Sequence, residues 1–494
     1  MRLLLVRPPA TFVRGSLAEA FEIPLGLMYL AAACERAGHD VEIYDPAVEY
    51  DLDRMNAVTD DGPVHVGASW EDVRARLART PCDVVGVSNP FYTQYPNALE
   101  TVRIAREVQP RAKILMGGPH PTVEPARVLG EAPALDVVVR GEAEETIVDL
   151  LRAFEAGTPL DGVQGIAFRD RREVVVTERR PYLTDLDALG RPAYHRIDLP
   201  KYMHRLRRDD AGRWTLRPHR VLTMLTSRGC PYECVFCSVH LHMGRQYRTH
   251  TPRFVLEHVQ YVVEELGVHR VYFVDDNLGQ DRERFEAILD GLISLRESGR
   301  DVTWETPNGI RTDRLTFDIL KKAKRAGCRS IVLTVESGSQ RVLDEVIGKR
   351  LDLDKVVEVA GWCKRLGLKA RSGFLVGLPG ETLEDMEKTV RFARMLRRRF
   401  GIHGHLSTAT PYFGTRLYDV CREGNFIQGE MTPERLAVAI QGEGIVATPA
   451  FSVEDVRAVR RRFERRGTLQ TAGKWIERTV KRLVRPRRRV HQHG

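Results

Sequence analysis

Three cysteines in one short run are the residues of this chain whose type and spacing most clearly predict chemistry. Cys230, Cys234 and Cys237 stand as Cys-x3-Cys-x2-Cys in the run TSRGCPYECVFCSVH. Cysteine thiolates are the usual ligands of iron–sulfur clusters, so three of them this close can hold three corners of a cubane cluster. The fourth iron would then lack a protein ligand. An open metal position supports chemistry, whereas a closed four-ligand site is usually structural or electron-carrying.

Two simpler interpretations of the same cysteines stay open at this point. One is a zinc knuckle, which needs a fourth Cys or His at ligand spacing, and His240 and His242 are near enough to serve. The other is three unrelated core cysteines. Eight cysteines in a long chain of this kind do not predict a disulfide framework. The isolated cysteines are expected to be small buried hydrophobes; they are Cys34, Cys82, Cys328, Cys363 and Cys421.

Length and composition predict a soluble globular protein of several domains. The chain has 494 residues, of which 43% are hydrophobic and 29% charged, which suggests two to four domains. No apolar run approaches the roughly 18 residues of a membrane span. The N-terminal MRLLLVRPP is too short for a signal peptide and is expected to form a buried first strand. We therefore expect a cytoplasmic protein.

The net charge of +9 is concentrated at the C-terminal end. From Asp455 to Gly494 there are 14 Lys/Arg and 3 Asp/Glu, a net charge of +11, which leaves −2 for all other residues. A charge run of this kind is usually solvated or disordered, so we expect no nucleic-acid partner. Apolar residues recur in it at roughly helical spacing, from Phe463 to Val484. A basic amphipathic helix there could contact an anionic membrane surface or dock on its own protein.

Residues 1–155 alternate short apolar strands with helices, as in a doubly wound parallel sheet of five strands. The expected helices cover 25–37, 70–79, 95–108, 121–130 and 143–155. In such a sheet, ligands bind outside the carboxyl ends of the strands. No Gly-x-Gly-x-x-Gly follows the first strand, so a nicotinamide or flavin dinucleotide is not expected. The expected strands are Arg2–Val6, Val41–Tyr44, Val84–Ser88, Lys113–Met116 and Val137–Arg140.

Residues 156–219 are expected to form an irregular connector, and residues 220–420 alternate strand and helix again. The connector is expected to carry a small hairpin, 165–168 against 174–177, and its Tyr182, Tyr194 and Tyr202 to pack between domains. Residues 421–494 are expected to be a helical region with the basic tail. The second set of strands is expected at Val221–Thr226, Arg270–Val274, Thr303–Thr306, Ser330–Thr334, Lys369–Leu375 and His405–Thr408.

The cysteine spacing, with the aromatic Phe236 just before the last cysteine, resembles the signature of the radical S-adenosylmethionine (SAM) enzymes. In that family SAM chelates the open iron, and one electron from the cluster cleaves it to a 5′-deoxyadenosyl radical. The six strand–helix units fit the partial (β/α)6 barrel of these enzymes. The cysteines then follow the first strand, at the carboxyl end where parallel barrels place their chemistry.

The resemblance also implies SAM contacts at the ends of the later strands. Asp275-Asp276-Asn277 occupies the place that contacts the SAM amino group, although the family's common Gly-Gly-Glu is absent. Arg311 could reach a carboxylate through two hydrogen bonds. Each piece alone is weak, since a strand-end carboxylate is as often a helix cap or a surface group. The implied SAM contacts are Phe236, Asp275, Asp276, Arg311, Glu336, Ser337, Gly377, Glu381 and Tyr412.

A parallel sheet ahead of such a motif resembles the cobalamin-dependent radical SAM enzymes. The segments EIPLGLMYLAAACERAGHDVEIYD and MGGPHPT resemble the corresponding segments of that family. The Asp-x-His-x-x-Gly motif whose His ligates cobalt is absent, so the resemblance implies a displaced lower base with no His in its place. His39 and His120 are expected to be loop and surface residues rather than cobalt ligands. The alternative is a degenerate sheet that binds nothing. The implied cobalamin contacts are Pro8, Pro9, Gly26, Ser88, Asn89, Gly117, Gly118, His120, Gly141 and Glu142.

The resemblance implies a C-methyltransferase that uses a [4Fe-4S] cluster, SAM and cobalamin and acts on a small molecule in specialised-metabolite biosynthesis. The deoxyadenosyl radical would abstract a substrate hydrogen, methylcobalamin would supply the methyl group, and a second SAM would restore it. An external electron donor of flavodoxin or ferredoxin type is implied. The alternatives are a cobalamin-dependent cyclase or rearrangement enzyme without methyl transfer, and a non-catalytic sensor. The cofactors carry the chemistry, so no catalytic side chain is assigned.

Overall fold

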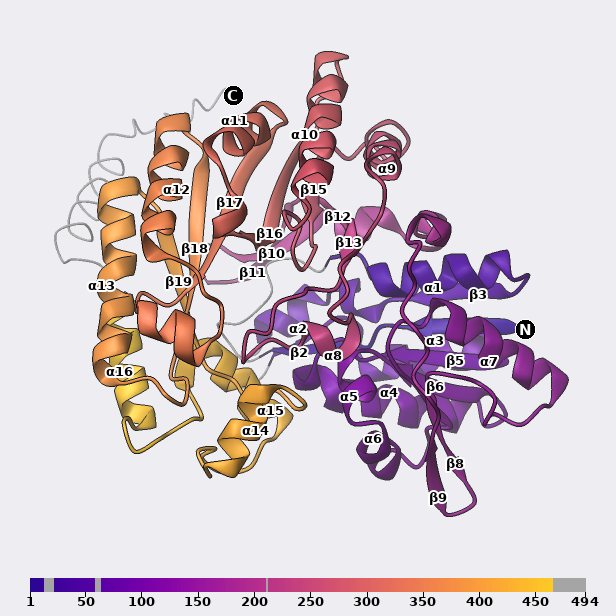
Figure 1. Cartoon of the computed structure of the whole chain (residues 1–494). Coiled ribbons are helices and arrows are strands. Elements are labelled where there is room, and N and C mark those ends of the chain that lie inside the picture. Colours follow the sequence, from indigo (N-terminus) through magenta and orange to yellow (C-terminus); the bar gives the residue numbers. More distant parts are fainter. Residues whose placement is uncertain (13–21, 58–63, 210–211, 465–494) are drawn as a thin grey trace, which may run out of the picture.

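The computed structural model describes residues 1–12, 22–57, 64–209 and 212–464. Figure 1 shows two α/β halves side by side, an N-terminal half in indigo to magenta and a C-terminal half in orange to yellow. The predicted basic amphipathic stretch lies outside the described residues, apart from its first part. Within the described residues, no helix is long and apolar enough to cross a membrane.

The N-terminal half is built on a seven-stranded sheet in the order β3-β1-β5-β6-β7-β8-β9. The first five strands are parallel, which confirms the predicted doubly wound sheet. Its core is formed by alternating buried side chains of the central strands, such as Leu4 and Val85 on one face and Leu3 and Val84 on the other. The strands are β1 (Arg2–Val6), β3 (Asp40–Tyr44), β5 (Val84–Ser88), β6 (Lys113–Gly117), β7 (Val137–Val139), β8 (Ile166–Asp170) and β9 (Glu173–Val176).

Helices cover this sheet and connect its parallel strands (Figure 1). They are α1 (Leu25–Arg36), α2 (Leu52–Ala57), α3 (Trp70–Arg79), α4 (Tyr95–Val108), α5 (Pro119–Val123), α6 (Pro125–Glu131) and α7 (Glu144–Ala156). A small antiparallel pair, β2 (Ala10–Phe12) with β4 (Val64–Val66), lies beside the sheet.

The predicted connector is more ordered than expected. Its hairpin forms as β8 and β9, but β8 pairs antiparallel with β7, so the hairpin extends the N-terminal sheet. The reason is that Ile166 and Ala167 are fully buried against that sheet. A second hairpin, β10 (His204–Arg208) with β11 (Trp214–Pro218), was not predicted. Tyr194 and Tyr202 are buried and hydrogen-bonded to His258 and Asp45, as expected of packing residues.

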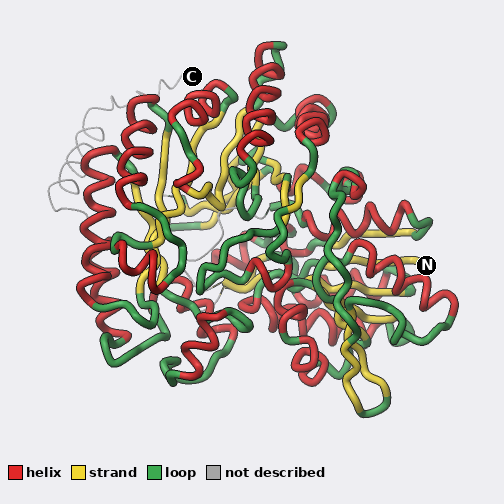
Figure 2. Tube along the Cα trace, in the orientation of Figure 1, coloured by secondary structure: helices red, strands yellow, loops and turns green. Residues whose placement is uncertain are grey.

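The C-terminal half contains six parallel strands in sequential order, β12-β15-β16-β17-β18-β19, as predicted. Figure 2 shows these strands as a curved inner layer with the helices outside. The strands are β12 (Leu222–Met224), β15 (Arg270–Phe273), β16 (Thr303–Arg311), β17 (Cys328–Glu336), β18 (Lys369–Val376) and β19 (His403–Thr408). The third is longer than expected: Arg311, predicted in the loop, ends β16, because the strand resumes after a bulge.

The helices of this half begin at well-formed caps. Thr382 and Asp385 make a reciprocal capping box at the start of α13, which satisfies two otherwise free backbone donors. The helices are α9 (Pro252–Glu264), α10 (Arg282–Glu297), α11 (Phe317–Arg325), α12 (Leu353–Leu366), α13 (Leu383–Phe400), α14 (Arg416–Glu423), α15 (Pro433–Val438) and α16 (Val453–Glu464).

The turn after β18 is closed by a carboxyl group of its own. Glu381 is 1% exposed, and its Oε2 accepts a hydrogen bond from the Leu378 amide at 2.8 Å. Burial raises the pKa of Glu381 to about 8, against the lowering effect of these backbone amides. The side chain therefore fixes the turn from inside, and it is protonated in the folded protein over a pH range in which a free carboxyl is ionised.

We expect Gly118→Ala to destabilise the fold, by on the order of 1–3 kcal/mol for the backbone strain alone. Gly118 has a φ of +127°, and an added Cβ would lie 2.2 Å from the carbonyl oxygen of Asn89. Urea denaturation measures the change. The control is Gly130→Ala in α6, where a Cβ meets nothing within 4 Å and alanine should be neutral or stabilising. Equal stability of the two variants would contradict the close approach.

We expect wild-type stability to fall, relative to Glu381→Gln, as pH rises from about 5 to about 8. The folded-state pKa is raised from the ordinary 4.5 to about 8, so between these values the folded protein retains a proton that the unfolded chain has lost. The stabilisation is complete below this range and is lost as pH rises through it. Urea midpoints of both proteins against pH measure the difference. A pH-independent difference would show that this carboxyl does not titrate as described.

Candidate active site between the two halves

The three cysteines lie on one loop whose two ends are held together by a short hairpin. The hairpin pairs β13 (Ser227–Arg228) with β14 (Arg248–Thr249) antiparallel, Arg228 opposite Arg248. Within the loop, the Cys237 amide donates to the Cys234 carbonyl at 3.0 Å, and the Cys230 amide donates to the Gly244 carbonyl at 3.3 Å. All three cysteines are partly buried. The loop therefore projects three thiols from a closed base at the carboxyl end of β12.

The tip of the loop is anchored to three other segments. The Val235 amide donates to the Ile347 carbonyl at 3.1 Å, and the Val235 carbonyl accepts from the Leu417 amide at 2.9 Å. Arg311 stacks on the Tyr232 ring at 3.7 Å, and this cation–π contact stabilises the pair beyond simple burial. The cysteines are thus presented by a loop that is fixed at its tip as well as at its base.

The two neighbouring carboxylates after β15 have different roles. Asp275 is 1% exposed, and its Oδ1 accepts from the Thr226 amide at 3.1 Å, from the Thr226 hydroxyl at 2.7 Å and from the Ser227 hydroxyl. It therefore fixes the start of the cysteine loop. Asp276 is only partly buried; burial and then the Asp275 charge raise its pKa to about 6. Its charge acts on Cys230 and Cys237, so Asp276 is the carboxylate beside the thiols.

Two cations also act on the thiols. The charges of Arg311 and Lys349 act on Cys230 and Cys234. Lys349 is 5% exposed and pairs with Glu336 at 2.9 Å, and Arg311 donates to the Lys349 carbonyl. Glu336 has a φ of 72°. This backbone conformation is uncommon for residues other than glycine, and residues that adopt it cluster at functional sites. Lys349 was not predicted from the sequence.

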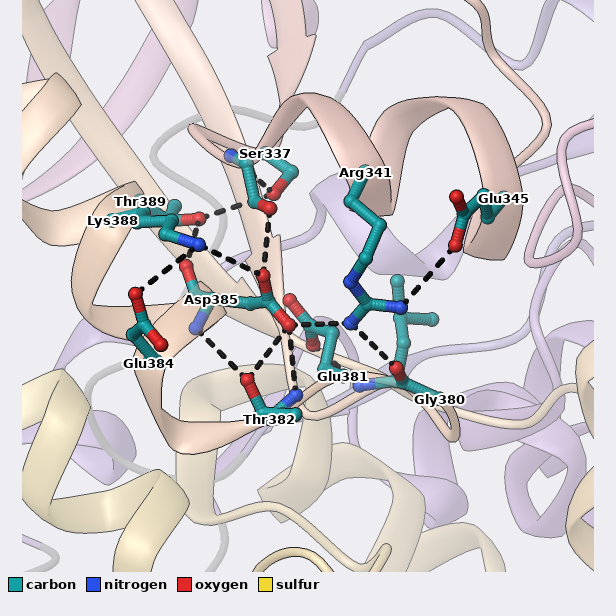
Figure 3. Close-up of polar contacts among 12 residues, drawn as sticks. Ser337, Arg341, Glu345, Gly380, Glu381, Thr382, Glu384, Asp385, Lys388 and Thr389 are labelled. Atoms are coloured by element: carbon teal, nitrogen blue, oxygen red, sulfur yellow. Dashed lines mark hydrogen bonds and ion pairs between the residues drawn. The ribbon is translucent and has the colours of Figure 1, made fainter.

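Asp385, also missed, joins the segment after β17 to the start of α13 (Figure 3). Its Oδ1 accepts from Ser339 at 2.7 Å, and its Oδ2 accepts from the Thr382 hydroxyl at 2.8 Å and from Arg341. Burial alone would raise the pKa of Asp385, but these donors hold it well below its usual range. Ser337 is fully buried and shares a hydrogen bond with Thr389 at 3.1 Å. Ser337 and Glu381 therefore stabilise the loops that follow β17 and β18.

The remaining predicted SAM contacts stay predictions, with differing exposure. Phe236 and Tyr412 are partly buried, and burial raises the pKa of Tyr412 to about 12. Gly377 has a φ of +85°, and a Cβ there would lie 3.3 Å from Val456. Among the predicted SAM contacts, the structure brings Asp276, Arg311 and Glu336 close to the thiols.

No group of three His, Cys, Asp or Glu side chains within the described residues is close enough to hold a single metal ion. This arrangement lends no support to a zinc knuckle that includes His240 or His242. A cubane cluster is less demanding, because each thiolate binds a different iron and the three sulfurs stay farther apart. Burial raises the pKa of all three thiols, that of Cys237 to about 12, so a bound cation is needed to keep them as thiolates.

An apolar cavity of ≈ 340 Å³ opens at the carboxyl ends of the N-terminal strands. Glycines form much of its wall, at Gly26, Gly86, Gly117, Gly118 and Gly141. A Cβ at Gly86 would lie 2.9 Å from Leu5, which also lines the cavity. Ser88 and Glu142 also line it, so six of the ten predicted cobalamin contacts meet at one cavity. A flat, largely apolar group fits such a wall.

Four predicted contacts do not line this cavity. Pro8 and Pro9 are buried at the end of β1. Asn89 is fully buried and supports the turn at Gly118. His120, expected at the surface, is 5% exposed and packs between Tyr92 and Tyr95, with ring centroids 4.5 and 4.7 Å away. His39 is likewise buried, at 8%. His120 is buried against these aromatic rings, whereas His39, in the turn before β3, lies beside the amino terminus and Glu155.

The cavity wall is completed by the C-terminal half. Leu225, Arg228, His242 and Met243 line it together with Tyr29 and Glu144 of the N-terminal half. His242 and Met243 belong to the cysteine loop itself. No sequence pattern predicts that these residues line the cavity, because they reach it only when the two halves pack together.

The isolated cysteines behave as expected in most cases. Cys34, Cys328, Cys363 and Cys421 are buried, and Cys82 is partly exposed. Burial raises the pKa of each of these thiols, so they are unreactive packing groups rather than ligands.

Comparison with known protein families agrees with this division of the chain. Residues 14–151 match the B12 binding domain family, and residues 224–393 match the radical SAM superfamily. These ranges contain most of the strands beside the glycine-lined cavity, all but β1, and most of the barrel, including the cysteine loop. The two matched families are thus those whose cofactors are cobalamin, an iron–sulfur cluster and SAM.

Several curated proteins are similar over most of this chain. An uncharacterized methyltransferase of Pyrococcus horikoshii is 30% identical over 86% of this chain and 84% of its own length. Cytidylyl-2-hydroxyethylphosphonate methyltransferase of Streptomyces wedmorensis is 28% identical over 94% and 89%. Anaerobic magnesium-protoporphyrin IX monomethyl ester cyclase of Cereibacter sphaeroides is 29% identical over 80% of this chain and 60% of the relative.

The fold has a close match among solved structures. The radical SAM methyltransferase TsrM of Kitasatospora setae, with cobalamin and a [4Fe-4S] cluster bound, superposes with a TM-score of 0.68 at 16% identity. The match covers 93% of this chain and 90% of that one. Together with the cysteine loop, the cavity and the extent of the sequence matches, these findings place the chain in the family of cobalamin-dependent radical SAM enzymes.

Proposed function

We propose that this chain is a radical SAM C-methyltransferase that adds a methyl group to a carbon atom of a small-molecule substrate. The observation that carries the proposal is that the cysteine loop contributes His242 and Met243 to the wall of the glycine-lined cavity. The sites for the two cofactors are thus adjacent, at the carboxyl ends of two parallel sheets. Two sequence relatives that the chain matches over most of their length are methyltransferases.

The residues have separate tasks in this proposal. Cys230, Cys234 and Cys237 hold the cluster, and Asp276 and Arg311 bind the amino and carboxylate groups of SAM through charge-assisted hydrogen bonds. The glycine-lined cavity holds part of cobalamin. When bound, these groups supply radical formation from SAM and delivery of a methyl group. The protein orients them and excludes water from the space between the halves.

The proposed reaction also needs an electron donor and a reducing compartment. A cluster with an open iron must be reduced by one electron before each cleavage of SAM, so we include an external donor of flavodoxin or ferredoxin type. A reducing compartment is required for this cluster, and we place the protein in the cytoplasm for that reason.

A second candidate reaction is a cyclisation that uses the same cofactors without methyl transfer. The observation that favours it is the similarity to the magnesium-protoporphyrin IX monomethyl ester cyclase. The chain spans 60% of that relative, compared with 89% of the Streptomyces methyltransferase. We therefore rank methyl transfer first.

We expect Cys230→Ala, Cys234→Ala and Cys237→Ala each to abolish the cluster and with it reductive cleavage of SAM. Removing one of three ligands leaves too few thiolates for a cubane. Iron content and the broad visible absorbance after anaerobic reconstitution measure the loss. Cys363→Ala, at a buried packing cysteine, is the matched control and should retain the cluster. Retention of a full cluster by any of the three variants would overturn the ligand assignment.

We expect SAM that carries a labelled methyl group to transfer the label to cobalamin in the reconstituted, reduced protein. Unlabelled S-adenosylhomocysteine should accumulate at the same time, because it is what remains of SAM once the labelled methyl group has been transferred. Mass spectrometry of the bound cobalamin and of the small molecules measures both. Formation of 5′-deoxyadenosine alone, with no S-adenosylhomocysteine and unlabelled cobalamin, would favour the cyclase over the methyltransferase.

A further inference from the structure

A cluster of four buried charges joins the two halves beside the cavity. Arg228 contacts Glu142 at 3.1 Å and Glu144 at 2.6 Å, and Arg248 contacts Glu142 at 2.7 Å. The four side chains are between 2% and 8% exposed. The two glutamates come from the N-terminal half, at the end of β7 and the start of α7. The two arginines come from the C-terminal half, so each ion pair crosses between the halves.

The arginines occupy special positions in the chain. Arg228 and Arg248 face each other in the hairpin that closes the base of the cysteine loop. Arg248 also donates to the Met243 carbonyl at 2.7 Å, within that loop, and to the Leu183 carbonyl at 2.8 Å. Any movement of this hairpin therefore moves the three cysteines.

The glutamates occupy an equally special place, because Glu142 and Glu144 line the cavity together with Arg228. Glu142 was predicted to contact cobalamin. In the structure its Oε1 accepts from Arg228 and Arg248 and its Oε2 from Arg248 and the Leu183 amide. Its acceptor sites are thus engaged by the other half and by the connector, which leaves it poorly placed to serve a ligand.

Stability alone does not explain this arrangement. Buried ion pairs give little net stability over well-packed apolar groups, because desolvation offsets their attraction. A buried network in which every charge is paired does fix one geometry, since any other arrangement leaves charges unpaired. Here the geometry that it fixes is the placement of the cysteine loop against the cavity wall.

We propose that Glu142, Glu144, Arg228 and Arg248 are positioning residues that set the separation and orientation between the cluster and cobalamin. The proposal rests on the proposed function, because it requires both cofactors. Glu142 is the central member, since its carboxylate is shared by both arginines. Cofactor-to-cofactor alignment matters for a reaction in which two groups must reach one substrate carbon, and a misplacement of about 1 Å is enough to impair such a step.

The test uses Glu142→Gln in the full chain, loaded with cobalamin and the cluster. This variant keeps the size of the side chain and removes the charge shared by Arg228 and Arg248. Pulsed electron paramagnetic resonance measures the dipolar coupling between cob(II)alamin and the reduced cluster, without any substrate. We expect a single narrow coupling in the wild type, and a broadened or shifted distribution in the variant at unchanged cofactor content.

Glu305→Gln is the matched control. Glu305 is 6% exposed and pairs with Arg270 at the other end of the barrel strands, away from the cysteine loop. It should lower stability in a comparable way and leave the dipolar coupling as in the wild type. A purely structural role for Glu142 predicts the same result in both variants.

The outcomes separate the two proposals. A wild-type coupling in loaded Glu142→Gln overturns the positioning role and leaves the proposed function intact. Failure of the wild-type protein to bind cobalamin overturns the proposed function itself. If Glu142→Gln does not bind both cofactors, the dipolar coupling is measured in Glu144→Gln instead. This variant removes the carboxylate that pairs with Arg228 alone, and we expect a smaller broadening of the coupling. An unchanged coupling in Glu144→Gln, or failure of both variants to load, also overturns the positioning role.

Discussion

The hydrogen bonds that the buried Asp275 carboxylate accepts are the constraint on which the rest of the site depends. One of its oxygens holds the Thr226 amide and the Thr226 and Ser227 hydroxyls, at the point where the chain leaves β12. From there the chain enters the short hairpin of Arg228 and Arg248, and the cysteine loop lies between its strands. Three thiols on a long loop have no fixed relation unless both ends of that loop are tied down.

The second constraint is shared by both halves and comes from their parallel strands. All strands of a parallel sheet end at the same edge, so the loops that follow them gather in one place. In the N-terminal half these loops are rich in glycine and leave a cavity; in the C-terminal half they carry charged groups around the thiols. The two edges meet, and His242 and Met243 of the cysteine loop close the cavity.

The sequence was sufficient for those features that repeat along the chain or lie close together in it. Strand and helix alternation predicted both sheets, and the Cys-x3-Cys-x2-Cys spacing predicted the loop. It could not separate the roles of Asp275 and Asp276, because neighbours in a strand end point in different directions. It also missed the placement of β8 and β9, because the pairing of β8 with β7 is set by burial of Ile166 and Ala167. The ion pairs between Glu142 and Arg248 join residues far apart in the chain, which no local pattern reveals.

The shared wall of the cavity also bears on how the protein is made. The N-terminal half leaves the ribosome first and can form its sheet as a unit. At that stage its cavity lacks Leu225, Arg228, His242 and Met243, which complete the wall in the finished structure. The carboxylates of Glu142 and Glu144 then face water instead of arginines. A cobalamin that met the nascent chain at that stage would therefore find a cavity without these four side chains.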